Sequence, residues 1–143
     1  MDYSLFEDEF GDKRNARTLA RASDIAYLAE FDASKQFSEQ MGLSAKLITA
    51  DNTQAYVATN DDHVVVAFRG TEAPTSIEGL KDWLLTDALN LLMVPEGRLG
   101  TDLAAAGVGA RFHQGFVNAI EEIWKPVYAN VERELANLDR PLW

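Results

Sequence analysis

Apolar residues follow a helical period near both ends of the chain and strand-like patterns between them. From about residue 14 to residue 30, apolar side chains recur at three- and four-residue steps, which predicts a first helix. We expect Asp32 to cap a second, shorter helix that reaches about Met41. Gly42 is a natural residue to end this helix, because glycine readily adopts the left-handed conformation common at helix C-termini.

A β section is predicted next. Leu47 and Ile48 indicate a short strand, and residues 54–59 and 63–68 indicate a hairpin around the polar turn 60–62. The first hairpin strand alternates weakly, whereas the second is apolar throughout. We therefore expect the second strand to lie inside a larger sheet that is covered on both faces.

Helical spacing returns in the second half of the chain. Residues 77–90 are predicted to be helical, residues 91–94 a short strand, and the Gly- and Ala-rich residues 96–111 a loop. A long helix is predicted from about Gly115 to Leu138, and Pro126 is expected to kink or restart it because proline lacks a backbone N–H. The last four residues, 140–143, look like the beginning of a further strand.

Strands that alternate with helices predict an α/β fold whose sheet is mixed and mainly parallel, with helices on its flanks. The long helix leads toward a strand that starts at the last residues, so we expect the sheet to be incomplete without a further C-terminal segment. Residues 1–12 are expected to form an N-terminal arm, and residues 13–143 to belong to one domain.

Composition narrows the classes of partner. The chain has 143 residues and a formal net charge of −10, which argues against a nucleic-acid partner and against electrostatic binding to anionic lipid. There is no cysteine, which excludes disulfides, thiolate chemistry and Cys-ligated zinc. The acidic N-terminus is not a signal peptide, and no apolar stretch is long enough to span a membrane. The compartment stays undetermined: cytoplasmic, or secreted after processing.

The segment Arg69-Gly70-Thr71 carries the clearest candidate chemistry, because it directly follows the apolar strand. Gly70 lets the backbone turn without steric cost, and the N–H and hydroxyl of Thr71 are suited to stabilise a negative oxygen during acyl transfer. The alternative is an ordinary polar turn at the end of a strand. No Ser, His and Asp in the chain form a convincing catalytic triad. Ser44 lies between a helix and a strand, the reverse of the order that a nucleophile elbow requires, and His63 is expected to be a surface residue.

Residues 18–143 resemble the class 3 lipase family, the fungal-lipase-like α/β-hydrolases. The resemblance is carried by four segments that follow the family's order: 52–58, 64–72, Asp82-Trp83 and 112–116. It implies that Thr71 is the oxyanion-hole residue, and that residues 77–90 form a lid with Trp83 as its aromatic residue and with Leu80 and Leu84 on its apolar face. Thr86 departs from the family, where an Asp or Asn often stands, and this leaves the role of the adjacent Asp87 in doubt.

The resemblance implies a carboxylic ester hydrolase, a triacylglycerol lipase or esterase, in which this chain is the N-terminal half of a single α/β-hydrolase domain. The serine nucleophile in its Gly-x-Ser-x-Gly elbow, the Asp and the His would then lie outside this chain. The implied partners are a C-terminal fragment of the same enzyme, an ester or acylglycerol substrate and, transiently, a lipid interface. No metal or organic cofactor is implied.

Two other classes of function remain open. The chain is alternatively a non-catalytic binding module on a hydrolase-like scaffold, which uses its Gly-rich loop and lid helix as a partner surface, or a structural subunit. A second polypeptide that co-purifies and contains Gly-x-Ser-x-Gly favours the enzyme, whereas a stable, soluble monomer favours the module.

Overall fold

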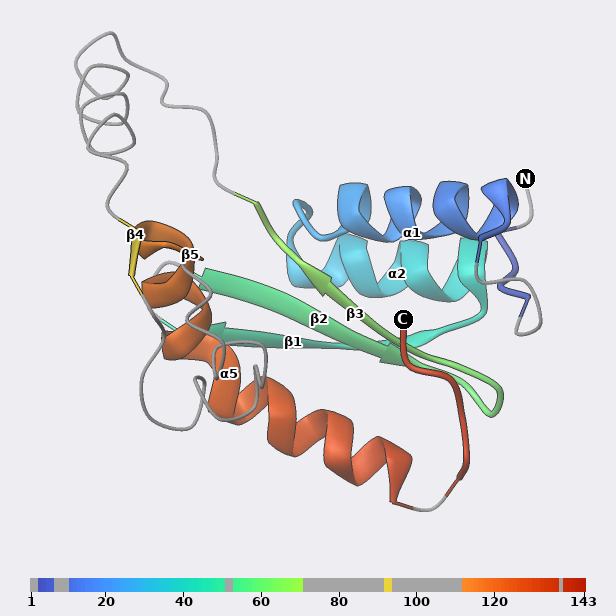
Figure 1. The fold of residues 1–143 in the computed structure, drawn as a ribbon. Coiled ribbons are helices and arrows are strands. Elements are labelled where there is room, and N and C mark those ends of the chain that lie inside the picture. Colours follow the sequence, from blue (N-terminus) through green and yellow to red (C-terminus); the bar gives the residue numbers. More distant parts are fainter. Residues whose placement is uncertain (1–2, 7–10, 51–52, 71–91, 94–111, 137) are drawn as a thin grey trace, which may run out of the picture. The chain divides into compact units, whose positions relative to one another are not determined.

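The computed structural model describes residues 3–6, 11–50, 53–70, 92–93, 112–136 and 138–143. The chain divides into two compact units. The first contains residues 1–70 and 125–143, and the second contains residues 71–124. The fold is mixed α/β: within the described part, three helices accompany a three-stranded antiparallel sheet and a pair of two-residue strands (Figure 1).

The sheet of the first unit has the order β1-β2-β3, with β1 at Ser44–Ala50, β2 at Thr53–Thr59 and β3 at Val64–Phe68. Both pairings are antiparallel, with Leu47 opposite Tyr56 and Val57 opposite Val66. The predicted hairpin is therefore confirmed. Its turn is held by the side chain of Asn60, whose Oδ1 accepts hydrogen bonds from the backbone N–H groups of Asp62 and His63.

The mainly parallel sheet that the sequence predicted is wrong for these strands. Two residues join β1 to β2 and four join β2 to β3, and connections that short force an antiparallel pairing. The expectation that the second hairpin strand, β3, lies inside the sheet is confirmed, because β2 pairs with one side of it and residues 141–143 pair with the other. Burial is most complete in β2, in which four consecutive residues are at most 3% exposed: Ala55, Tyr56, Val57 and Ala58.

One parallel pairing does occur. Residues 141–143 run beside β3, with Leu142 opposite Val64. Three backbone hydrogen bonds join them: Val64 N to Pro141 O, Trp143 N to Val64 O and Val66 N to Trp143 O, at 3.0, 2.9 and 2.9 Å. The expected beginning of a strand at the end of the chain is thus confirmed. It is parallel because the long helix returns the chain to the same end of the sheet before it pairs.

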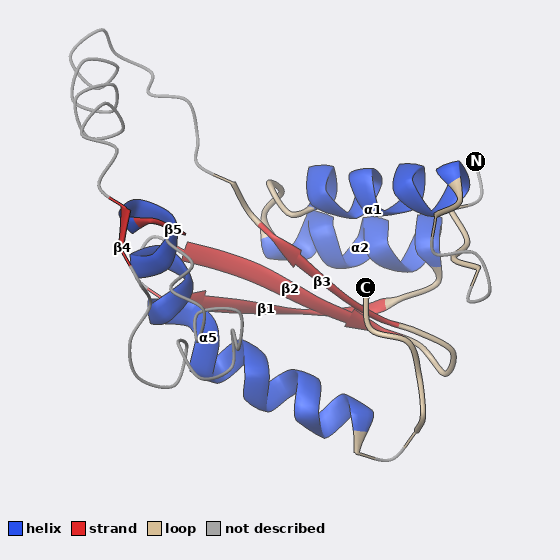
Figure 2. Ribbon diagram, viewed as in Figure 1, coloured by secondary structure: helices blue, strands red, loops and turns tan. Residues whose placement is uncertain are grey.

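Helices α1 (Lys13–Ile25) and α2 (Glu30–Met41) cover one face of this sheet, with α1 against β3 and α2 against β1 (Figure 2). Alternate sheet residues point into this layer, as the period of a strand requires. Tyr56 meets Phe37 there, with ring centroids 5.6 Å apart. The core between helices and sheet is formed by Ala22, Ile25, Ala26, Ala33, Phe37, Met41, Leu43, Tyr56, Ala58, Val65 and Ala67.

The ends of α2 test two predictions. Gly42 follows the helix with φ 65° and ψ 26°, so the expected left-handed C-cap is confirmed. The expected N-cap at Asp32 is wrong, because the helix starts at Glu30 with Ala29 as its N-cap. Asp32 lies instead in the first turn, where the positive end of the helix dipole stabilises a carboxylate.

Helix α5 spans Gln114–Leu135. Pro126 was expected to kink or restart the helix; the helix continues through it, so it does not restart there, and the kink stays a prediction. The carbonyl that loses its partner belongs to Glu122, an exposed residue, where water can take the place of the missing N–H. In the first unit, the C-terminal half of α5 lies on the sheet face opposite α1 and α2, where Lys46 Nζ donates to Asn130 Oδ1 at 2.9 Å (Figure 1).

In the second unit, β4 (Leu92–Met93) pairs antiparallel with β5 (Phe112–His113) directly before α5. The short strand predicted at 91–94 is confirmed at these two residues. The helix predicted at 77–90 and the loop predicted at 96–111 lie outside the described residues.

Residues 3–6 of the predicted arm are hydrogen-bonded to helices α1 and α2. Tyr3 N donates to Gln40 O at 3.2 Å, and Thr18 Oγ1 donates to Ser4 O at 3.1 Å. Asn15 makes two bonds with the Phe6 backbone, one through each end of its amide. Asn15 and Thr18 are buried polar residues of α1, and the backbone of this segment provides hydrogen-bond partners for their side chains.

Candidate functional site

The exit of β3 is where the sequence places the candidate chemistry, and its first two residues, Arg69 and Gly70, are described. Arg69 is held by Gln54 of the neighbouring strand in two ways. Its backbone N–H donates to Gln54 O at 2.9 Å, and its Nη1 donates to Gln54 Oε1 at 2.8 Å. The antiparallel ladder is thereby continued one residue past β3, which fixes the direction in which the chain leaves the sheet.

Gly70 follows, with the tip of the Tyr27 side chain close to its Cα. A Cβ at this position would collide with the hydroxyl oxygen of Tyr27 and lie 3.4 Å from its Cζ. Among the described glycines only Gly42 has a positive φ, so Gly70 does not adopt the left-handed conformation. A side chain here would require the half-exposed Tyr27 side chain to shift, because its hydroxyl occupies the position of the Cβ.

Tyr56 lies beneath this exit, fully buried on β2. Its hydroxyl donates to Leu28 O at 3.1 Å, which ties the connection between α1 and α2 to the sheet. Burial raises the pKa of the Tyr56 hydroxyl above its ordinary value, the charge of Glu30 raises it further, and the charge of Arg69 opposes both. This hydroxyl is therefore a neutral donor that holds the α1–α2 connection in place.

The four site residues predicted from the sequence are not tested. Thr71, the expected oxyanion donor, and Leu80, Trp83 and Leu84, the expected lid residues, all lie outside the described residues. Of the residues around this position, the structure describes Arg69 and Gly70, which directly precede Thr71. It also describes their neighbours Gln54, which is hydrogen-bonded to Arg69, and Tyr27, which lies beside Gly70.

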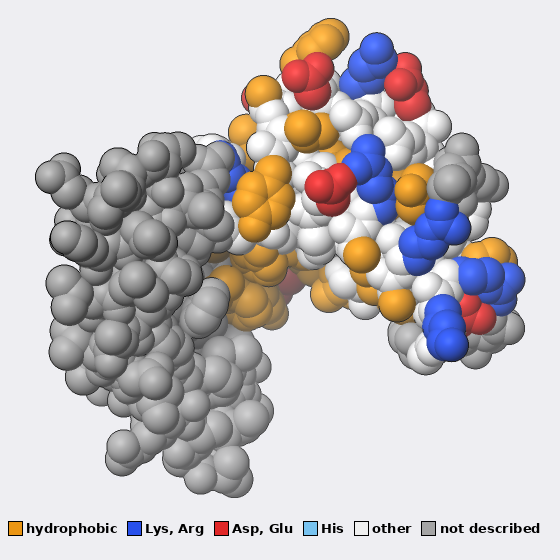
Figure 3. Space-filling model, turned by 90° about the horizontal axis from the view of Figure 1, so that it is seen from above, with side chains coloured by type: hydrophobic (Ala, Val, Ile, Leu, Met, Phe, Trp, Pro, Cys, Tyr) orange, Lys and Arg blue, Asp and Glu red, His pale blue; other side chains and the backbone are white. Residues whose placement is uncertain are grey.

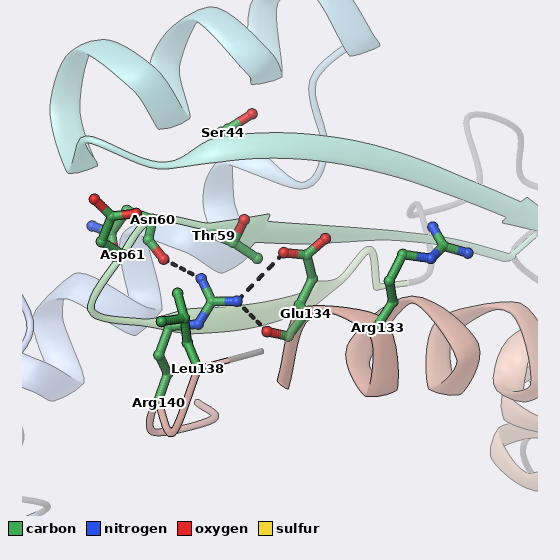
Figure 4. Close-up of a pocket in the computed structure, with 8 residues that line it drawn as sticks. All are labelled: Ser44, Thr59, Asn60, Asp61, Arg133, Glu134, Leu138 and Arg140. Atoms are coloured by element: carbon green, nitrogen blue, oxygen red, sulfur yellow. Dashed lines mark hydrogen bonds and ion pairs between the residues drawn. The ribbon is translucent and has the colours of Figure 1, made fainter. Parts of the chain in front are cut away.

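A separate hollow lies at the other end of β3, beside the β2–β3 turn (Figure 4). It encloses about 530 Å³ and is lined by Ser44, Thr59, Asn60, Asp61, Arg133, Glu134, Leu138 and Arg140. The Arg140 side chain is 8% exposed and donates to the carbonyl oxygens of Asn60 and Glu134. Figure 4 shows its guanidinium turned toward these two residues, so this arginine fastens the turn to the end of α5.

Two other polar residues weighed in the sequence are described. Ser44 is the first residue of β1 and is exposed, so it follows helix α2 and precedes a strand, as its sequence position indicated. His63, expected at the surface, is partly buried and directly precedes β3. Its Nε2 is buried and has no hydrogen-bond partner within the described part of the chain. It lines a small hollow of about 190 Å³ together with Ser4 and Asp62.

Sequence reasoning missed Tyr27 as a neighbour of the candidate site. Its only local signal is its place in the turn just after α1, and nothing in that position indicates a contact with the far end of β3. Gln54 and Arg69 were part of the segments that carried the family resemblance, but their mutual hydrogen bonds depend on the strand register.

Figure 3 shows the face that α1 and α2 present, on which basic and acidic side chains are interspersed with apolar ones. Within the described ranges, no group of three or more His, Asp or Glu side chains is arranged to hold a metal ion. Among the described helices, none is both long enough and apolar enough to cross a membrane. Comparisons with protein-family models, with curated proteins and with solved structures found no match to this chain.

Proposed function

We propose that this chain is part of a carboxylic ester hydrolase of the class 3 lipase type, which acts on acylglycerols or simpler esters through a serine nucleophile. The observation that supports it best is the parallel pairing of residues 141–143 with β3. In α/β-hydrolases a Gly-x-Ser-x-Gly elbow follows a strand of the sheet. The carboxyl ends of adjacent parallel strands meet at one edge, which is where α/β folds place their ligands.

The register gives this proposal a definite geometry. Leu142 is opposite Val64, and β3 ends four residues later at Phe68. A chain that continued past Trp143 in the same register would draw level with Phe68 after about four more residues from Leu142. A turn at that point would bring a serine beside Gly70 and the residue that follows it. The wider sheet of the proposed domain would gain its parallel strands from this side of β3.

In the proposed reaction, the serine oxygen attacks the ester carbonyl while a histidine accepts its proton and an aspartate orients the histidine. The carbonyl oxygen becomes an oxyanion, and the N–H and hydroxyl of Thr71 donate to it. Trp83, Leu80 and Leu84 form the apolar face of a lid that meets lipid when it opens. The nucleophile, the histidine and the aspartate come from a C-terminal segment outside these 143 residues, and the reaction uses no metal or organic cofactor.

The experiment is hydrolysis of p-nitrophenyl butyrate by the native protein that carries this chain, with the wild type compared with Thr71→Val and Thr71→Ala. Loss of one oxyanion donor lowers kcat by about 10²- to 10³-fold, and by less if only the hydroxyl contributes. Thr75→Val, four residues further along the same segment, is the matched control and keeps wild-type kcat. A fluorophosphonate probe, which labels activated serines, is expected to label the native protein outside residues 1–143.

Three results would count against the proposal. Full activity in both Thr71 variants removes the oxyanion assignment. Ester hydrolysis by the purified 143-residue chain alone contradicts the division of the catalytic groups. Absence of both esterase activity and probe labelling in the native protein favours the non-catalytic binding module.

A further inference from the structure

Strand β1 forms one edge of the described sheet. It pairs with β2 on one side, and no described strand lies on its other side, whereas β3 at the opposite edge is continued by residues 141–143. The pairing of β1 with β2 runs without a bulge from Ser44 to Ala50. An edge strand of this length and regularity can accept a further strand.

The register determines which backbone groups of β1 point away from β2. In an antiparallel pair, successive residues direct their N–H and C=O groups alternately toward one neighbour and toward the other. Gln54 O accepts from Arg69 N, so Gln54 directs its backbone groups toward β3 and away from β1. Thr49 is opposite Gln54, so the N–H and C=O groups of Thr49 point off the edge of the sheet. By the same alternation, those of Ala45 and Leu47 also point off the edge.

This edge lacks the features that commonly block strand addition, which are a proline, a bulge or a charged side chain that guards the edge. β1 contains no proline, and its one charged residue, Lys46, is turned toward α5, where its Nζ donates to Asn130 Oδ1 at 2.9 Å. A hollow of about 480 Å³ opens between α2 and the first residues of β1, and the helix lines it with the small side chains of Ser34 and Ser38. Within the described ranges, no backbone hydrogen bond joins the outward groups of β1 to another part of the chain.

A second copy of this chain fits the edge by symmetry. A two-fold axis beside Leu47 places Leu47 of one copy opposite Leu47 of the other, and Ala45 opposite Thr49, in an antiparallel register. The residues with outward groups are arranged symmetrically about Leu47, so their N–H and C=O groups can pair with one another. Lys46 comes opposite Ile48 of the other copy, so the only charged residue of the strand does not directly oppose its own counterpart.

We propose that β1 is a self-association edge, at which two copies of this chain pair β1 with β1 and join their three-stranded sheets into one. The contact is mainly between two strand backbones, so the dimer is weak and reversible. Each chain carries a formal net charge of −10, and we expect added salt to strengthen the dimer by screening the repulsion between the copies. The inference is independent of the proposed function, because it uses only the pairing of the strands.

The test is sedimentation equilibrium of the native protein, combined with amide hydrogen exchange at several protein concentrations. We expect a reversible monomer–dimer equilibrium that shifts toward the dimer as salt is added. The amides of Ala45, Leu47 and Thr49 are expected to exchange on the order of tenfold more slowly in the dimer than in the monomer. The amides of Lys46 and Ile48, which face β2, are the internal control and are protected in both states.

Thr49→Pro removes one outward N–H from each copy, at a position where an edge strand tolerates proline. The symmetric pairing loses two hydrogen bonds, so we expect the dimer Kd to rise by on the order of tenfold. Thr49→Val is the matched control, because it keeps the N–H and the β-branched shape, and it is expected to retain the wild-type Kd. If Thr49→Pro does not fold, the exchange pattern of the wild type decides the question.

Three results would overturn the inference. The first is a native protein that stays monomeric at every concentration and salt. The second is a dimer whose outward β1 amides exchange as fast as in the monomer, since that dimer forms through another surface. The third is protection of these amides at every dilution, which means that another segment of the native protein already covers the edge.

Discussion

Arg69 and Gln54 are joined twice, by a backbone hydrogen bond of 2.9 Å and by a side-chain hydrogen bond of 2.8 Å from Nη1 to Oε1. The backbone bond extends the β2–β3 ladder beyond the last residue of β3. The side-chain bond places a positive charge at the same point, near the buried Tyr56 hydroxyl whose pKa it acts to lower. The last described residues before the candidate oxyanion donor are therefore held by a strand pairing and a charged hydrogen bond together.

Gln54→Ala removes the side-chain bond and leaves the backbone bond in place. We expect it to lower the free energy of unfolding by about 1.5 kcal/mol, the usual contribution of a hydrogen bond to a charged group. Gln54→Glu is the matched variant, because it keeps an acceptor for the guanidinium and is expected to retain wild-type stability. Urea unfolding measures both. Equal stability of Gln54→Ala and the wild type would show that the side-chain bond contributes nothing.

The arm at residues 3–6 depends on Asn15, which is 1% exposed. Its Oδ1 accepts from Phe6 N and its Nδ2 donates to Phe6 O, both at 2.9 Å. Asn15→Ala leaves both Phe6 groups without these partners, and we expect a loss of about 1–3 kcal/mol in the free energy of unfolding. Ser23→Ala, an exposed position on the same helix, is expected to change stability by less than about 0.5 kcal/mol. Thermal or urea unfolding of the two variants compares them, and equal effects would mean that the arm is not held through Asn15.

Arg140 fastens the β2–β3 turn to the end of α5 and leads directly into the residues that pair with β3 (Figure 4). Arg140→Ala removes donors from two carbonyl groups and leaves a buried hollow, so we expect a loss of about 3 kcal/mol in stability. Arg140→Lys is expected to lose less, because one ammonium group replaces only part of the fork of donors.

Arg133 provides the control for this measurement. It lines the same hollow but is exposed, and its contact with Asn130 Oδ1 is long, at 3.4 Å. Arg133→Ala is expected to change stability by less than about 0.5 kcal/mol. If Arg140→Ala were as mild as Arg133→Ala in urea unfolding, the turn and the helix would be held together by other contacts.

Features that depend on a few adjacent residues were predictable from the sequence. The turn at 60–62 follows from the tendency of Asn side chains to bond the backbone two and three residues ahead, and Asn60 does this. The end of α2 follows from the ability of Gly42 to adopt a positive φ. The start of α2 was wrong because Asp32 is a good cap in isolation. The Tyr56–Leu28 bond and the packing of Ala33 and Phe37 fix the helix earlier, at Glu30.

Features that depend on pairing between distant residues were not predictable in the same way. A sequence pattern shows that β1, β2 and β3 are strands but not in which direction neighbouring strands run, so the mainly parallel sheet was a wrong prediction. The candidate site shows the same limit. Arg69 and Gly70 were identified from their place after a strand, whereas Tyr27 and Gln54 enter only through tertiary contacts.

The Tyr56 hydroxyl makes stability depend on pH in the alkaline range. Its pKa in the folded protein is raised above 10.0, chiefly by burial, so the unfolded chain gives up this proton at a lower pH than the folded chain does. Above about pH 10 the unfolded state therefore binds fewer protons, and the free energy of unfolding falls as pH rises. Tyr56→Phe removes this dependence together with the bond to Leu28 O, which is expected to cost about 1 kcal/mol at pH 7. The advantage of the wild type over Tyr56→Phe, measured by urea unfolding between pH 7 and pH 11, should be constant below pH 9 and shrink above pH 10. The other three tyrosines are common to both proteins, so their titration cancels in the difference. An advantage that stays constant up to pH 11 would mean that burial does not favour the neutral hydroxyl at this position.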